Sequence, residues 1–128
     1  MNNKENDNVI IILPAKSEYV STARLTASSV STRAGFNIDE VEDIKVAVSE
    51  VCNIILSRTQ NKISQYRISF DINTDNIKIT FTAENTTLNC FEESIENEYG
   101  LYIMKALMDS VELCNEEHSI VMTKRIGV

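Results

Sequence analysis

One apolar stretch of the chain carries a carboxylate and an amide at a spacing that could hold a metal-bound nucleotide. Glu50 lies in this stretch and Asn53 follows three residues later. Such a site on a helix also requires a polar ligand one full turn after the carboxylate, because residues four apart share a face. That residue is Ile54, and its side chain has no lone pair for magnesium, a hard cation that takes oxygen ligands. The stretch therefore reads as a nucleotide site with one ligand missing.

Composition bounds the class of protein. The chain has 128 residues and 43% hydrophobic content, enough for one domain with its own core. Its net charge of −7 argues against a nucleic-acid-binding surface, and no apolar run is long enough to span a bilayer. The three cysteines are odd in number and lack metal-ligand spacing, which predicts reduced thiols, a cytoplasmic location and no metal site. They are Cys52, Cys90 and Cys114.

The first third of the chain predicts an edge strand followed by a helix. Residues 9–13 are short and β-branched, and Pro14 ends the run. Ser17 can cap a helix that continues to about Arg33, where Gly35 breaks it. Residues 1–8 are polar, and we expect them to form a disordered tail before a single domain at residues 9–128.

A second helix is predicted from its cap and its apolar period. Asn37, with Glu40 three residues later, has the pattern of a capping box. The residues that follow place apolar side chains at helical spacing, which predicts a stripe facing the core. Cys52 is expected to be a small core residue on the same helix. The stripe consists of Val41, Ile44, Val48, Val51 and Ile55.

Alternating patterns in the second half predict two hairpins around a third helix. Residues 65–72 and 77–81 each alternate polar and apolar side chains about a short turn. Residues 83–98 are polar and acidic and are predicted to form a loop. Residues 99–110 have helical spacing, and residues 111–113 and 120–123 are predicted to form a second hairpin. Helices and hairpins are segregated, so the predicted fold class is α+β: a two-layer sandwich with a mixed, largely antiparallel sheet covered on one face by about three helices.

A chain of short motifs resembles a known family. The resemblance is to the anti-sigma factor serine kinases of spore-forming bacteria, the sigma-B and sigma-F type regulators. These belong to the histidine-kinase-like (GHKL) ATPase superfamily. The match extends over about residues 9–126, in order, and no single motif would be specific. The matching segments are residues 13–20, 23–26, 42–50, 100–111 and 122–125.

The resemblance implies a function and a set of partners. Proteins of this family bind a sigma factor and hold it away from RNA polymerase. They also bind ATP with magnesium and phosphorylate a serine of a small STAS-type antagonist, and they work as homodimers. By the same resemblance, Arg24 and Thr22 belong to a partner-binding surface on the first helix.

The resemblance also assigns roles around the nucleotide. Glu50 matches the family glutamate in the role of base, and the magnesium-binding asparagine falls at Ile54. Asn53 is rotated by about 100° around the helix and could reach the site only if the helix turned locally. The aspartate that reads adenine falls at Glu84, one methylene longer.

The lid over the phosphates departs further from the family. Its last glycine is Gly100, but Asn97 and Glu98 stand before it, and glycine would permit the dihedrals that bring backbone N–H groups onto phosphates. The glycine after the adenine reader falls at Thr86, and a late threonine near adenine falls at His118.

Two readings stay open at the level of sequence. In the first, the chain is a binding module of the anti-sigma type with a degenerate ATP site and no cofactor. In the second, it is an active ATP-dependent serine-protein kinase that uses ATP and magnesium, with Asn53 replacing the usual ligand. Ile54, Thr86 and the lost lid glycines favour the first.

Overall fold

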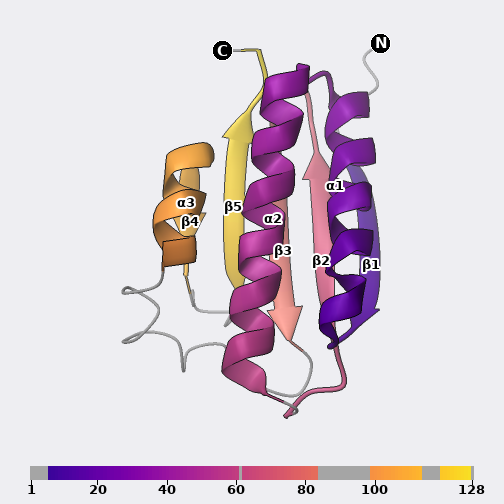
Figure 1. The fold of residues 1–128 in the computed structure, drawn as a ribbon. Coiled ribbons are helices and arrows are strands. Elements are labelled where there is room, and N and C mark those ends of the chain that lie inside the picture. The colour runs from indigo at the N-terminus through magenta and orange to yellow at the C-terminus, as the bar shows by residue number, and fades with distance from the viewer. Residues whose placement is uncertain (1–5, 61, 84–98, 114–118, 128) are drawn as a thin grey trace.

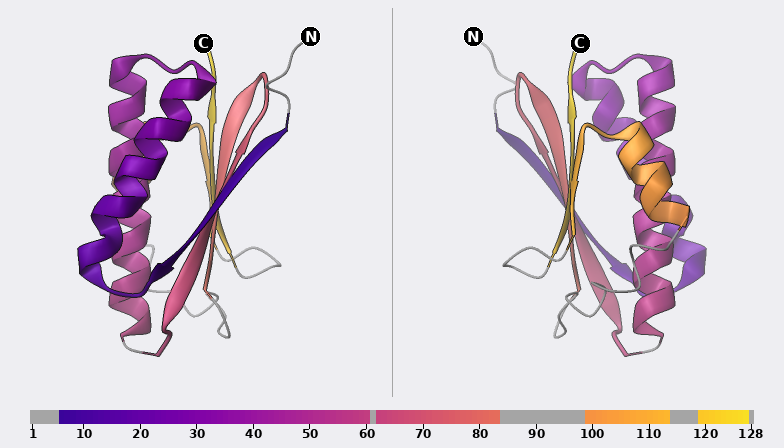
Figure 2. Two further views of the ribbon diagram at one scale, coloured as in Figure 1. Left: turned by 90° about the vertical axis from the view of Figure 1, so that its right-hand side faces the viewer. Right: turned by 90° about the vertical axis from the view of Figure 1, so that its left-hand side faces the viewer.

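Five antiparallel strands form one sheet, and helices cover one of its faces. The structure is a computed structural model that describes residues 6–60, 62–83, 99–113 and 119–127. In this part of the chain the strand order is β1-β2-β3-β5-β4, and α1, α2 and α3 lie on the same side of the sheet (Figure 1, Figure 2). The α+β two-layer sandwich is therefore confirmed. The prediction allowed for a mixed sheet, and each of the pairings is antiparallel.

The described elements follow the predicted order. The first strand begins at Asp7, two residues earlier than predicted and inside the expected tail. The third helix ends at Leu107, three residues earlier than predicted. The elements are β1 (Asp7–Pro14), a 3-10 turn (Ser17–Tyr19), α1 (Val20–Ala34), α2 (Ile38–Thr59), β2 (Gln65–Ile72), β3 (Asn76–Ala83), α3 (Tyr99–Leu107), β4 (Ser110–Glu112) and β5 (Ile120–Arg125).

The start of the first helix differs from the prediction. Ser17 opens a 3-10 turn instead of capping an α-helix, and α1 begins at Val20 with no side-chain cap. The predicted end is confirmed. Gly35 adopts the left-handed conformation with φ of 110°, and its N–H donates hydrogen bonds to the carbonyls of Ser31 and Thr32. Glycine takes this conformation without a steric penalty.

The second helix has the predicted cap and the predicted buried stripe. The Asn37 side chain accepts a hydrogen bond from the Glu40 backbone N–H at 2.8 Å, and the Glu40 carboxylate accepts from the Asn37 N–H at 2.9 Å. All five residues of the stripe are buried. α2 lies over the sheet between α1 and α3 (Figure 1), so it is the central helix of the layer.

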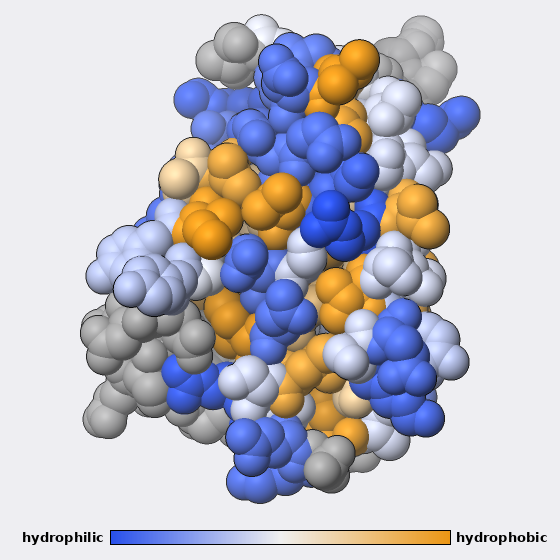
Figure 3. Space-filling view, in the orientation of Figure 1, coloured by the Kyte–Doolittle hydropathy of each residue, from blue (hydrophilic) through white to orange (hydrophobic). Residues whose placement is uncertain are grey.

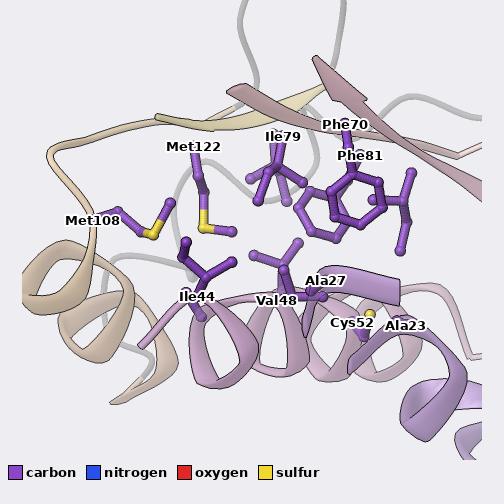
Figure 4. Packing of buried hydrophobic residues seen from close by; sticks show 14 of the residues in the cluster. Ala23, Ala27, Ile44, Val48, Cys52, Phe70, Ile79, Phe81, Met108 and Met122 are labelled. Carbon is purple, nitrogen blue, oxygen red and sulfur yellow. The ribbon is translucent and has the colours of Figure 1, made fainter. Parts of the chain in front are cut away.

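The core fills the space between α2 and the middle strands. β2 and β3 bury every second residue, and Phe70, Ile79 and Phe81 point from the sheet toward α2 (Figure 4). Cys52 is fully buried, as predicted, and lies beside Ala23 of α1 (Figure 4). Small residues at this contact let the two helices approach closely.

One buried hydroxyl in this core has no hydrogen-bond partner among the described residues. It belongs to Tyr66, which is 1% exposed. The Cys52 thiol is the polar group beside it, and sulfur is a weak acceptor. Burial raises the pKa of Cys52 to about 11 and raises the pKa of Tyr66 above its usual range. Both groups are therefore neutral and buried at physiological pH.

We predict that Tyr66→Phe leaves the free energy of unfolding unchanged or raises it by up to about 1 kcal/mol, because it removes an unpaired buried hydroxyl and keeps the ring. Urea denaturation measures the change. Tyr66→Ala is the control and should cost about 3–5 kcal/mol, since it empties the same site. A loss above about 1 kcal/mol for Tyr66→Phe would mean that the hydroxyl has a partner.

Candidate functional site

The face of α2 that meets α3 carries two of the predicted site residues. Glu50 is partly exposed, and Ile54, one turn later, is 4% exposed. Asn53 is exposed to solvent, rotated about 100° from Ile54 around the helix. Because α2 is continuous from Ile38 to Thr59, it has no local turn that would bring Asn53 onto this face.

Gly100 packs directly on these two residues. A methyl group added at Gly100 would lie 2.8 Å from Glu50 Oε1 and 3.3 Å from Ile54 Cδ1. The first turn of α3 therefore approaches α2 closely, and it can do so because Gly100 has no side chain. The structure brings Glu50, Ile54 and Gly100 together at one contact, and hydrophobic surface lies over α3 and the neighbouring part of α2 (Figure 3).

The chemistry of this contact is a poor match to magnesium. Magnesium requires oxygen ligands in near-octahedral geometry. Of the three residues that meet here, Glu50 alone has a side-chain oxygen, and Ile54 presents a hydrocarbon. Within the described ranges, no group of three or more His, Cys, Asp or Glu residues is placed to hold a metal ion. These residues therefore do not fit a magnesium-bound phosphate held from α2.

Several predicted positions lie outside the described residues. They concern the adenine reader, the lid and the late threonine position. These residues are Glu84, Thr86, Asn97, Glu98 and His118.

The predicted partner residue Arg24 has a structural contact that its sequence position did not reveal. Its guanidinium Nη1 donates a hydrogen bond to Ser49 Oγ at 2.8 Å, and Arg24 is partly buried. The Ser49 hydroxyl in turn donates to the Lys45 carbonyl at 3.0 Å. The bond joins α1 to α2 one residue before Glu50. Thr22 is exposed, as a partner-facing residue requires.

Sequence reasoning missed Ser49. The available signal was a hydroxyl residue in an apolar helix run, where a buried polar group needs a hydrogen-bond partner. Ser49 is 7% exposed, so the bond to Arg24 also satisfies a group that water reaches poorly.

We predict that Gly100 and Glu50 are energetically coupled. In the Glu50→Ala background, Gly100→Ala should raise the free energy of unfolding by up to about 1 kcal/mol, through helix propensity. In the wild-type background the gain should be smaller by about 0.5 kcal/mol or more, because the new methyl group displaces the carboxylate. Urea denaturation of the four proteins gives the coupling. Effects that add to within about 0.3 kcal/mol would contradict the close contact.

Comparisons with known proteins agree with this architecture. Residues 13–124 match the family model of the histidine kinase-like ATPase domain. No helix of the described part is both long and apolar enough to cross a membrane.

Similar proteins of known function include serine-protein kinases. The serine-protein kinase RsbW of Bacillus mycoides (strain KBAB4) is 32% identical over 131 residues, which cover 89% of this chain and 82% of the relative. RsbW of Bacillus cereus (strain AH187) is 33% identical over 132 residues, with the same two shares. RsbW of Halalkalibacterium halodurans is 30% identical over 131 residues, 91% of this chain and 80% of the relative.

Proposed function

Because this chain belongs to the histidine kinase-like ATPase domain family, and has serine-protein kinases RsbW among its relatives, we propose that it is an anti-sigma-factor-type regulator of transcription with a degenerate ATP site. The observation that supports a degenerate ATP site is the position of Ile54. It is 4% exposed and stands where the family resemblance expects an oxygen ligand for magnesium.

The proposed partners are a sigma factor, a STAS-type antagonist, or both. Binding of the sigma factor would keep it from RNA polymerase, in the cytoplasm, where transcription takes place. The proposed surface includes Arg24 and Thr22 on α1. We propose further that the chain forms a homodimer through β1 and α1, since an apolar edge strand is usually covered. Residues 9–128 would act as one domain.

The alternative is an active ATP-dependent serine-protein kinase in which Asn53 replaces the missing ligand and Glu50 keeps the role of base. The exposure of Asn53 on a continuous α2 speaks against this replacement. In the proposed reading, Glu50, Glu84 and Gly100 are remnants of an ATP site, and no cofactor is needed.

We predict that magnesium-ATP does not bind at micromolar concentration, because magnesium lacks an oxygen ligand at Ile54. Isothermal titration calorimetry should give no binding heat. The melting temperature should not rise with magnesium-ATP, since a ligand that binds only the folded state raises stability. RsbW of Bacillus cereus is the matched positive control. Saturable, magnesium-dependent heat with the wild-type chain would contradict the degenerate site and favour the kinase.

We predict that Arg24 contributes to partner binding beyond its bond to Ser49. Arg24→Ala should weaken binding of a sigma-B-type sigma factor or a STAS-type antagonist by about tenfold or more, since arginine is enriched among residues that dominate interfaces. Ser49→Ala removes the same internal hydrogen bond but keeps the guanidinium, and should change binding by less than about threefold. Surface plasmon resonance measures both, with melting curves to confirm folding.

Substituting alanine is preferable to reversing the charge. Because Arg24 is partly buried, Arg24→Glu would place a carboxylate against α2 and confound binding with stability. Wild-type affinity in Arg24→Ala would exclude this part of α1 from the interface. Equal losses in Arg24→Ala and Ser49→Ala would assign Arg24 a purely structural role.

A further inference from the structure

A groove lies between β1 and α1 on the helix side of the sheet. Its volume is about 580 Å³, and sites for small molecules commonly measure roughly 300–1,000 Å³. The side chains at its base are buried, whereas Val9 on β1 is 37% exposed and Leu25 on α1 is 69% exposed. The groove therefore presents apolar surface to solvent. The buried residues at its base are Val30, Ala34 and Ile72.

Two opposite charges stand at one end of this groove. The C-terminal end of α1 and the N-terminal end of β1 lie at the same end of the molecule (Figure 1, Figure 2). Arg33 and Asp7 both line the groove, so they approach this end from its two walls. Both side chains are exposed, and within the described residues neither forms an ion pair. Each charge is therefore available to a ligand.

The strand directs Asp7 toward the helices. Side chains alternate between the two faces of a strand. Leu13 is buried in the core and Ile11 packs against the same core, so the odd-numbered residues of β1 face the helix layer. Val9 and Asp7 continue this alternation, and both line the groove. The carboxylate of Asp7 thus belongs to the same face as the apolar wall.

The wall formed by α1 is basic in an acidic protein. The whole chain has a net charge of −7, yet the 15 residues of α1 include two arginines and no Asp or Glu. Ser29 and Arg33 are four residues apart and share one face of the helix, and both line the groove. This face offers a hydroxyl and a guanidinium to an anion, and hydrogen bonds from a guanidinium to a carboxylate are among the strong ones.

We propose that this groove binds a free α-amino acid with a large apolar side chain. The carboxylate of the ligand pairs with Arg33, its ammonium group pairs with Asp7, and its side chain lies along Val9 over the buried base. A simple fatty acid would bring its carboxylate toward Asp7, and a simple amine would bring its charge toward Arg33. A zwitterion matches both charges. The site goes beyond the proposed regulator and needs neither its partners nor a nucleotide.

An NMR titration of the ¹⁵N-labelled chain with L-tryptophan tests the site, because tryptophan combines the zwitterion with a large apolar ring. The backbone amide signals of Val9, Ser29 and Arg33 should move saturably, with a dissociation constant of about 1 mM or less. The signal of Tyr102, on α3, should stay in place.

Paired changes in ligand and protein test each charge. N-acetyl-L-tryptophan lacks the ammonium group and should bind the wild-type chain at least about threefold more weakly than L-tryptophan. In Asp7→Asn the same change of ligand should cost less than about 1.5-fold. L-tryptophanamide lacks the carboxylate, and its weaker binding should disappear in the same way in Arg33→Gln. Lys105→Gln removes an exposed charge on α3 and should preserve the wild-type order of the three ligands.

A substitution inside the groove tests the space apart from its charges. Ser29→Phe places a ring between the walls and should weaken L-tryptophan binding by about tenfold or more. Thr32→Phe places the same ring on α1 at an exposed residue outside the groove lining, and should leave the affinity within about threefold. Circular dichroism confirms that both variants fold.

Three results would overturn the amino-acid site. The first is the absence of shifts with L-tryptophan at up to about 10 mM. The second is an equal loss on N-acetylation in the wild-type chain and in Asp7→Asn, which would remove the zwitterion. The third is a set of groove signals that move when the chain is diluted but not with L-tryptophan, which would assign the groove to a second copy. None of these results bears on the magnesium-ATP titration or on partner binding, which test the regulator separately.

Discussion

The packing of α2 against its three neighbours is the constraint on which the rest of the structure depends. The sheet supplies an apolar surface, because β2 and β3 bury alternate residues. α1 and α3 approach α2 from its two sides, and each does so where a side chain is small or absent. Ala23 and Ala27 are fully buried on α1, and a methyl group at Gly100 would have to displace the Glu50 carboxylate. Interiors packed to this density respond to single methyl groups.

That packing places two functional candidates on two different faces of one helix. Ser49 and Glu50 are consecutive, so they point about 100° apart around α2. Ser49 therefore receives Arg24 from α1, and Glu50 meets Gly100 from α3. An isoleucine at position 54 suits this arrangement, because burying its side chain contributes about 1.5–3 kcal/mol to stability. A buried amide there would need hydrogen-bond partners instead. Packing at this contact therefore stabilises a side chain that cannot bind magnesium.

The sequence predicted the local features well and the contacts between helices poorly. The capping box at Asn37 and the alternation of residues 65–72 depend on neighbours a few positions away, so pattern alone was enough. The hydrogen bond from Arg24 to Ser49 joins residues 25 positions apart, and the local sequence around either residue does not predict it. The prediction that Ser17 caps the first α-helix was wrong for a related reason. A serine favours the start of a helix, but here Ser17 begins a 3-10 turn that follows β1 and precedes α1. The position of Gly100 was predicted from family resemblance, and the reason for it appears only when α3 is seen against α2.

In the proposed reading, partner binding is not switched by a nucleotide. A nucleotide adds stability only to the state that binds it, and this chain has Ile54 where the family resemblance expects the oxygen ligand. The occupancy of the proposed surface on α1 would then follow the concentrations and affinities of the partners alone. The proposed homodimer would enter the same balance, because Leu25, next to Arg24 on α1, lines a groove beside β1. A second copy seated at β1 would lie close to the partner surface, and binding at one could raise or lower affinity at the other. Thermodynamic linkage requires any such effect to be reciprocal. The physical link between the two surfaces is α1, which lies next to β1 and is held to α2 through Arg24 and Ser49.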